Sequence, residues 1–251
     1  MNIESIKAKG FAVSLLVFPV MLLAGFLMHP NLLKLEPLQT VEQLVGRFHN
    51  KWVYHIGHLI VMFAVPVIMT ALLSIMNVLQ GKGKPYGFWG GITGVFGAFI
   101  LAVDKGALCL VLSAFDTLPE DKFQEFVPFL GVIVHKAGLL WVVWLLPLLP
   151  VGAAIQAMGL LKEKFISRWQ TVCIITGLVL LNNPDIEIIS SSGALLMCAG
   201  YIPWGVRILQ GRMKCSSTAC PLYSEKKNRN FKCKQPYGKN ESNCLLKVRT
   251  S

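Results

Sequence analysis

Long apolar runs constrain this chain more than any other feature of its sequence. Blocks of roughly 18 to 30 mostly apolar residues alternate with short polar joints, and about 18 apolar residues let a helix cross a bilayer. Hydrophobic residues make up 54% and charged residues 15% of the 251 residues, whereas soluble domains are about a quarter charged. One aqueous core could not bury this much apolar surface, so we expect an integral membrane protein.

The apolar blocks predict an all-α, polytopic transmembrane helix bundle of about six spans within residues 1–211. The first block follows Lys7 and Lys9 as in a signal peptide, but it lacks a small-residue cleavage site and more spans follow, so we interpret it as retained. The fourth block is too long for one straight helix, and Pro147 and Pro150 give it a reason to bend or break. The fifth is the shortest. The expected spans are residues 11–28, 52–79, 88–112, 129–160, 169–186 and 188–209.

Lysine and arginine residues flank these spans asymmetrically. With six crossings, the basic residues before the first span, in the second and fourth joints and after the last span all fall on one side of the membrane. Loops rich in lysine and arginine stay in the cytoplasm, so both termini are expected inside. The joint that contains Asp116, Glu120, Asp121 and Glu125 falls on the opposite side. We therefore expect a plasma (inner) membrane protein with both ends in the cytoplasm.

The formal net charge of +11 could also suggest nucleic-acid binding. The basic residues of a nucleic-acid reader should cover one folded face, whereas here they lie in joints and in residues 212–251, which argues against a nucleic-acid partner. This tail lacks apolar runs, so we expect a disordered cytoplasmic segment that contacts anionic inner-leaflet lipids. Its cysteines lack the two close pairs typical of a zinc site. They are Cys215, Cys220, Cys233 and Cys244.

Glycines are concentrated at the start of the third span. Gly87, Gly91 and Gly94 lie on one helical stripe, where another backbone can approach closely. A phosphate-binding glycine loop would follow a strand and end in Gly-Lys-Ser/Thr, and neither condition is met here. The stripe therefore predicts a helix-packing face, either within the chain or toward a membrane partner or a second copy.

Ionisable residues within or beside membrane spans are energetically costly and are therefore candidates for function. At about 1.5 Å of rise per residue, Asp104 and Lys105 lie roughly 24 Å above the inner end of the third span, near the outer edge of a core about 30 Å thick. Lys136, Asp185 and Glu187 are expected at a similar height. These five residues form a candidate substrate or proton pathway. We expect Asp104 to pair with Lys136 or with a histidine of another span rather than with its neighbour Lys105.

Histidines at the same height suggest a second kind of site. His55 and His58 are three residues apart and share a helical face, and together with His135 they could bind a transition metal or a haem. The chain has no H-E-x-x-H or comparable metal-binding spacing. Histidine beside Trp52 is also common at the headgroup boundary, where it anchors a helix. A metal or haem site is therefore the less favoured interpretation.

Three functions are compatible with these features. The favoured one is a small transporter-like protein with a polar cluster of histidine, aspartate and lysine near the outer boundary. The alternatives are a haem- or metal-binding membrane redox protein or enzyme, and a non-catalytic membrane module that packs against a partner. The sequence assigns neither a reaction nor a cofactor. It does predict that any site opens toward the outer side.

Overall fold

The computed structural model describes residues 3–30, 32–183 and 186–211. Within these ranges the chain forms helices and their connections, and no strand. Five helices are long and apolar enough to cross a membrane. This confirms the predicted helical membrane bundle, and the chain is a multi-pass integral membrane protein. The tail, residues 212–251, and the candidate residue Asp185 lie outside the described ranges.

Two bundle helices are much shorter than the rest. α7, with 15 residues, continues from the segment before it, so that Gly138–Lys162 together form a candidate span of 25 residues, whereas α8 has no such extension. α8 has 14 residues, which rise about 21 Å, whereas the hydrocarbon core is about 30 Å thick. It begins at a capping box, in which the side chains of Ser167 and Gln170 each accept the other's backbone N–H, and the helix of this fifth predicted span ends at Leu181. The bundle helices are α1 (Ile3–Leu27), α3 (Trp52–Val78), α4 (Lys84–Phe115), α7 (Leu148–Lys162), α8 (Arg168–Leu181) and α9 (Glu187–Leu209).

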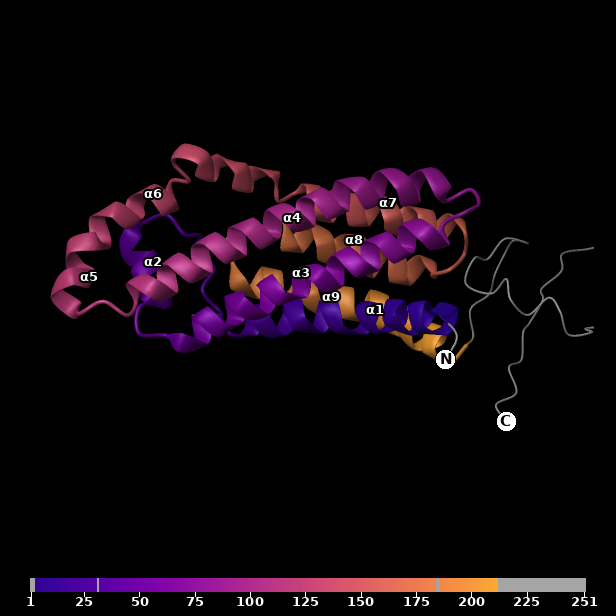
Figure 1. Cartoon of the computed structure of the whole chain (residues 1–251), viewed down its shortest axis with the longest axis horizontal. Coiled ribbons are helices and arrows are strands. Elements are labelled where there is room, and N and C mark those ends of the chain that lie inside the picture. The colour runs from indigo at the N-terminus through magenta and orange to yellow at the C-terminus, as the bar shows by residue number, and fades with distance from the viewer. Residues whose placement is uncertain (1–2, 31, 184–185, 212–251) are drawn as a thin grey trace, which may run out of the picture.

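These helices form a closed ring. Going around it, α1 packs against α3, α3 against α4, α4 against α7, α7 against α8, α8 against α9, and α9 against α1 again. Figure 1 shows them lying roughly parallel along the long axis of the molecule. A ring of this kind can enclose a space between its helices, which is where the candidate site lies.

Glycines allow α4 to approach its two neighbours closely. A Cβ added at Gly87, Gly91 or Gly94 would lie 2.9 to 3.1 Å from a side-chain atom of α3 or of the residue that follows it. A Cβ at Gly90 would lie 2.6 Å from the carbonyl oxygen of Gly152 in α7. The chain's own helices therefore cover the glycine stripe, and it does not offer a free face to a separate partner.

The fourth apolar block, residues 129–160, is not one helix. It passes through η1 (Val127–Leu130), α6 (Gly131–Val134) and η2 (Gly138–Leu145) before α7 begins at Leu148. Lys136 and Gly138 have φ angles of 49° and 60°, which a helix does not accommodate. Pro147 precedes α7, where a missing backbone N–H costs nothing. The chain is thus broken near the two prolines and also, unexpectedly, ten residues before them.

A small cap covers one end of the ring. It consists of α2 (Val41–Phe48), α5 (Glu120–Phe126), η1 and α6, which Figure 1 shows at the end of the bundle away from the N-terminus. The cap has a hydrophobic core of its own, separate from that of the bundle. Its buried members are Leu44, Phe48, Tyr54, Leu112, Phe123 and Leu130.

The opposite end of the bundle is basic. Because neighbouring helices alternate in direction, the start of α4 and α8 and the end of α7 and α9 lie together there, with Lys84, Arg168, Lys162 and Arg207. The positive-inside rule predicts that this basic end faces the cytoplasm. The capped end would then face outward.

Candidate binding cavity

A cavity of about 390 Å³ lies within the ring. Its walls include residues of all six ring helices, together with α2 and the segment that leads into α7. The volume falls within the roughly 300 to 1,000 Å³ of small-molecule pockets. The cavity is therefore large enough for a small ligand.

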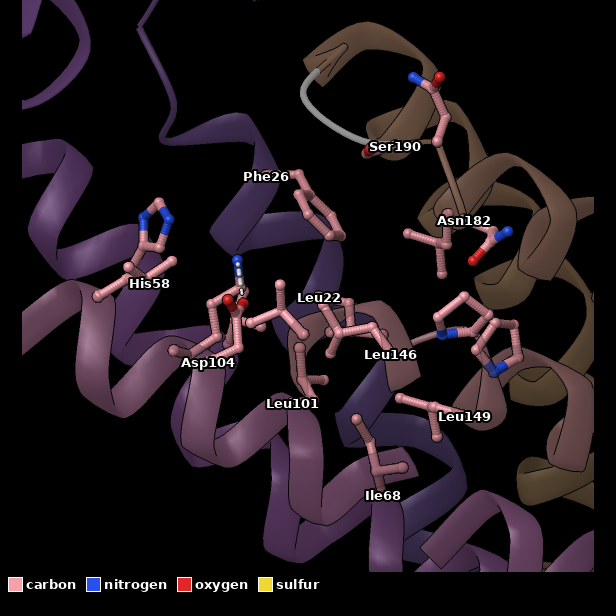
Figure 2. A pocket seen from close by; sticks show the side chains of 18 of the residues that line it. Leu22, Phe26, His58, Ile68, Leu101, Asp104, Leu146, Leu149, Asn182 and Ser190 are labelled. Atoms are coloured by element: carbon pink, nitrogen blue, oxygen red, sulfur yellow. Dashed lines mark ion pairs between the residues drawn. The ribbon is translucent and has the colours of Figure 1, made fainter. Parts of the chain in front are cut away.

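Polar side chains gather at the capped end of this cavity. They come from segments far apart in the sequence, and Figure 2 shows His58, Asp104, Asn182 and Ser190 around the same space. The polar lining residues include His29, Arg47, His58, Asp104, Lys105, Lys136, Asn182, Asn183, Glu187 and Ser190.

The rest of the lining is apolar. In Figure 2, Ile68 of α3 and Leu149 of α7 lie on the side of the space away from Asp104, and Leu22 of α1 and Leu101 of α4 lie between them and Asp104. Toward the basic end of the bundle the lining continues with further leucine, isoleucine and alanine side chains. The cavity is therefore amphipathic along its length.

The polar layer lies one membrane thickness from the basic end. On three helices the polar lining residue is twenty residues from a basic residue, and twenty residues of helix rise about 30 Å, the thickness of the hydrocarbon core. This spacing agrees with the prediction that the polar groups lie near the outer membrane boundary, and their position in the membrane stays a prediction. The three pairs are Lys9 with His29, Lys84 with Asp104, and Arg207 with Glu187.

Asp104 and Lys105 form an ion pair, with Lys105 Nζ 3.2 Å from Asp104 Oδ2. This differs from the expectation that Asp104 would pair with Lys136 or a histidine. Both residues line the cavity, and the four-carbon stem of Lys105 lets its ammonium fold back toward the preceding residue. Lys136 instead lies over an aromatic ring, with Nζ 4.7 Å from the centre of the Trp144 ring.

A second ion pair links the cap to the bundle. Arg47 Nη1 of α2 lies 3.3 Å from Glu187 Oε1, the first residue of α9. His29 Nδ1 donates to the carbonyl of Gly25 at 3.0 Å and lies 3.8 Å from Glu187 Oε2. Burial and the nearby Lys105 lower the pKa of His29 to about 4, so its ring is neutral at physiological pH.

His58 is the one predicted histidine that faces the cavity. Its ring centre lies 4.6 Å from that of His29. Its Nδ1–H donates to the carbonyl of Tyr54 at 3.2 Å, because a carbonyl can only accept. Nε2 is the ring nitrogen that remains for a ligand.

The other two predicted histidines lie elsewhere. His55 Nε2 donates to Asp116 Oδ2 at 3.1 Å, and His49 Nδ1 donates to the other oxygen of the same carboxylate at 2.9 Å. His135 is exposed at the end of α6. His55, His58 and His135 therefore do not converge on one ligand, and the described part of the chain contains no group of three or more histidine, cysteine or acidic side chains that could hold a metal ion.

Asp116 connects the cap to the ends of α3 and α4. Burial raises its pKa, but hydrogen bonds from the backbone N–H of Asn50 and from His55 and His49 outweigh burial, so the net direction is downward. The carboxylate is therefore ionised down to low pH. This cluster holds the cap in place and does not line the cavity.

The cavity lining contains more cations than acids. Arg47, Lys105 and Lys136 are positive, whereas Asp104 and Glu187 are negative. Counting the histidines as neutral, the lining has a surplus of one positive charge. All three cations are half-buried, and a surplus charge in such a site favours a ligand of opposite sign.

Two lining residues that matter here were not predicted from the sequence. His29 ends the first apolar run, at the same height as the candidates on other helices, and this height is the signal that could have identified it. Arg47 comes from a joint outside the membrane, and nothing in its local sequence indicates that it reaches Glu187, 140 residues away.

No known protein family matches this chain, and neither a curated protein nor a solved structure matches it.

Proposed function

We propose that this chain is a small transporter-like membrane protein that takes up an amphiphile with a small anionic head group, such as a carboxylate or a phosphate. The observation that carries the proposal is the amphipathic cavity within the ring, polar at its capped end and apolar along the rest. A small inorganic ion would leave the apolar walls without a partner. An entirely apolar ligand would make no contact with the charges of the two ion pairs in the lining, Arg47–Glu187 and Lys105–Asp104.

The head group would lie among Arg47, Lys105 and Lys136. At present Glu187 and Asp104 pair with the first two of these cations at 3.3 and 3.2 Å. An anionic head group could take the place of either carboxylate, since carboxylates and phosphates bind guanidinium and ammonium groups in the same way. The surplus positive charge of the lining favours such an exchange.

The apolar part of the ligand would extend toward the basic end, between α1, α3, α4 and α7. Each Å² of apolar surface removed from water contributes about 25 cal/mol. Chain length should therefore increase affinity until the cavity is full. Leu101 and Leu149, on the adjacent helices α4 and α7, both line this part.

Transport, rather than binding alone, would use the interruption of the ring before α7. Discontinuous helices near the membrane midplane are typical of transporter binding sites. Here η2 and α7 meet at Pro147, and residues on both sides of the joint, Leu146 and Leu149, line the cavity. Movement at this joint would change the cavity wall directly.

The binding experiment uses the full chain in nanodiscs with three radiolabelled decyl amphiphiles. Decyl phosphate is expected to bind at least about tenfold more tightly than decyltrimethylammonium or decyl glucoside, a difference of about 1.4 kcal/mol. Leu101→Trp should fill the cavity and weaken decyl phosphate binding by at least about tenfold. Val103→Trp is the matched control, because Val103 is 45% exposed on the same helix and does not line the cavity.

Equal binding of the cationic and anionic amphiphiles, or an unchanged affinity in Leu101→Trp, would contradict the proposed ligand class. Proteoliposomes then separate transport from binding. We expect decyl phosphate flux in the wild type and in Val103→Trp, and a flux in Leu101→Trp that falls with its affinity. Binding without any flux would leave a lipid-binding protein instead of a transporter.

A further inference from the structure

A second cavity, of about 470 Å³, lies beside the first. All of its lining residues are apolar. They come from the end of α4 that lies at the cap, from α5, η1 and α6, and from the start of η2. They are Ala107, Leu108, Val111, Phe115, Phe126, Phe129, Leu130, Val132, Ile133 and Leu140. We call this cavity the apolar groove.

The groove and the central cavity share a wall. Leu108 and Ile133 line both spaces. Each of these residues is three positions from a lysine of the polar cluster, Lys105 on α4 and Lys136 after α6, and on α4 this spacing is about one helical turn. A single molecule could therefore reach from the groove to the polar cluster, past these two side chains.

The groove also faces the surrounding membrane. The groove begins at Ala107, one helical turn along α4 from Asp104. Its rim is exposed although it is apolar: Phe129 is 68% exposed and Val111 is 42% exposed. Apolar side chains exposed on the surface of a membrane protein are in a position to contact the acyl chains of the adjacent leaflet.

We infer that the ligand of the central cavity is a long-chain membrane lipid with an anionic head group, and that it reaches the cavity laterally from the leaflet at the capped end, through the apolar groove. This inference rests on the proposed function and specifies its substrate class. Leu108 and Ile133 act as the partition that the lipid passes. The acyl chain stays in apolar surroundings throughout, while the head group moves one helical turn to the lysines.

Lateral access explains why the groove has no polar lining. A water-soluble anion approaching from the aqueous side would gain nothing from a cavity whose ten lining residues are all apolar. An acyl chain that moves from the bilayer into the groove would lose little free energy, because the groove around it is also apolar. The cost of crossing is then the displacement of two side chains at the partition.

The test uses hexadecyl phosphate with a photoactivatable diazirine at the end of its chain, in phosphatidylcholine proteoliposomes of the full chain. The readout is the yield of cross-links to cavity-lining peptides of α4 and α7 after a short incubation. Ala107→Phe, which narrows the groove, should lower this yield at least about fivefold. Ala114→Phe is the matched control, since it is seven residues further along the same exposed side of α4 and lines neither cavity.

Leu108→Ala should raise the yield of cross-links, because it opens the partition between the groove and the central cavity. Misfolding would lower the yield, so it cannot produce the same result. Hexyl phosphate added from water should bind Ala107→Phe with wild-type affinity. A wild-type cross-linking rate in Ala107→Phe would overturn lateral access while leaving the proposed function standing. Binding of hexyl phosphate without any cavity cross-links from hexadecyl phosphate would do the same, and binding of neither would refute both proposals.

Discussion

The contact between α4 and α7 permits a sharp test of the ring that encloses the cavity. Gly97 lies where the two backbones meet. A Cβ added there would lie 2.6 Å from Leu149 Cα, a separation below 3.0 Å that real Cβ atoms essentially never show. The atom in the way belongs to the backbone, so no side-chain rotation can relieve the overlap. Gly97→Ala therefore forces the helices apart.

The size of the effect follows from two opposing contributions. Alanine is favoured over glycine inside a helix by about 1 kcal/mol, whereas overpacking of a tight interface costs typically 1 to 3 kcal/mol and occasionally more. Because the obstacle is backbone, we expect a cost near the upper end and a net destabilisation of about 2 kcal/mol. Separation would also weaken the neighbouring contact of Gly90 with Gly152.

Gly10→Ala provides the control. It makes the same chemical change inside a membrane helix, α1, where an added Cβ would meet nothing within 4 Å. The measurement is thermal unfolding in detergent micelles, followed by the reactivity of the buried thiols of Cys109 and Cys198. We expect a lower midpoint for Gly97→Ala and an unchanged or slightly higher one for Gly10→Ala. Equal midpoints for the two variants would refute the close approach of α4 and α7.

Two predictions concern the cap. Thr40→Ala removes the hydroxyl that accepts a hydrogen bond from the backbone N–H of Gln43 at the start of α2. Loss of such a helix cap costs about 1 kcal/mol, so the backbone amides of α2 should exchange with deuterium about fivefold faster. The exchange of the α8 amides should not change. Asp116→Asn tests the pH dependence: because the pKa of Asp116 is lowered in the folded chain, its contribution to stability is present above its ordinary pKa of 3.8 and is lost as the pH falls through the folded value. In the wild type, the protection of the α2 and α5 amides from exchange should thus fall as the pH is lowered. In Asp116→Asn this protection should already be lower at neutral pH and should change less in acid. The same loss of protection in acid in both proteins would contradict the role given to Asp116.

The membrane bundle was predictable because its determinants are local. A run of apolar residues of sufficient length must be a helix in lipid, and glycine spacing within α4 indicates its packing side whatever the neighbour is. The cap was not predictable in this way. Residues 129–145 are as apolar as a membrane span, and composition cannot distinguish a span from the short helices η1, α6 and η2. The chain breaks at Lys136 and Gly138, which have positive φ angles, and a lysine gives no sequence signal of such a conformation.

The candidate site was predictable in height but not in membership. Counting residues along a helix places Asp104, Lys105 and Glu187 in one layer, because helical rise is constant. Rotation about the helix axis is decided by packing, so His55 and His58 diverge although they are three residues apart. Arg47 was missed because its role depends on a contact with α9 that no local pattern encodes, whereas the height of His29 at the end of the first apolar run could have identified it.

The contacts of Arg47 connect the two halves of the proposed mechanism. Arg47 belongs to the cap, Glu187 belongs to the bundle, and their ion pair lies in the lining of the central cavity. An anionic head group that pairs with Arg47 would release Glu187 and weaken the tie between cap and bundle. Because such coupling is reciprocal, the state in which Arg47 has separated from Glu187 should bind the head group more tightly, by the same factor by which the head group favours that state. Ligand binding and opening of the cap would then be one linked equilibrium, with Arg47 exchanging one carboxylate or phosphate for another.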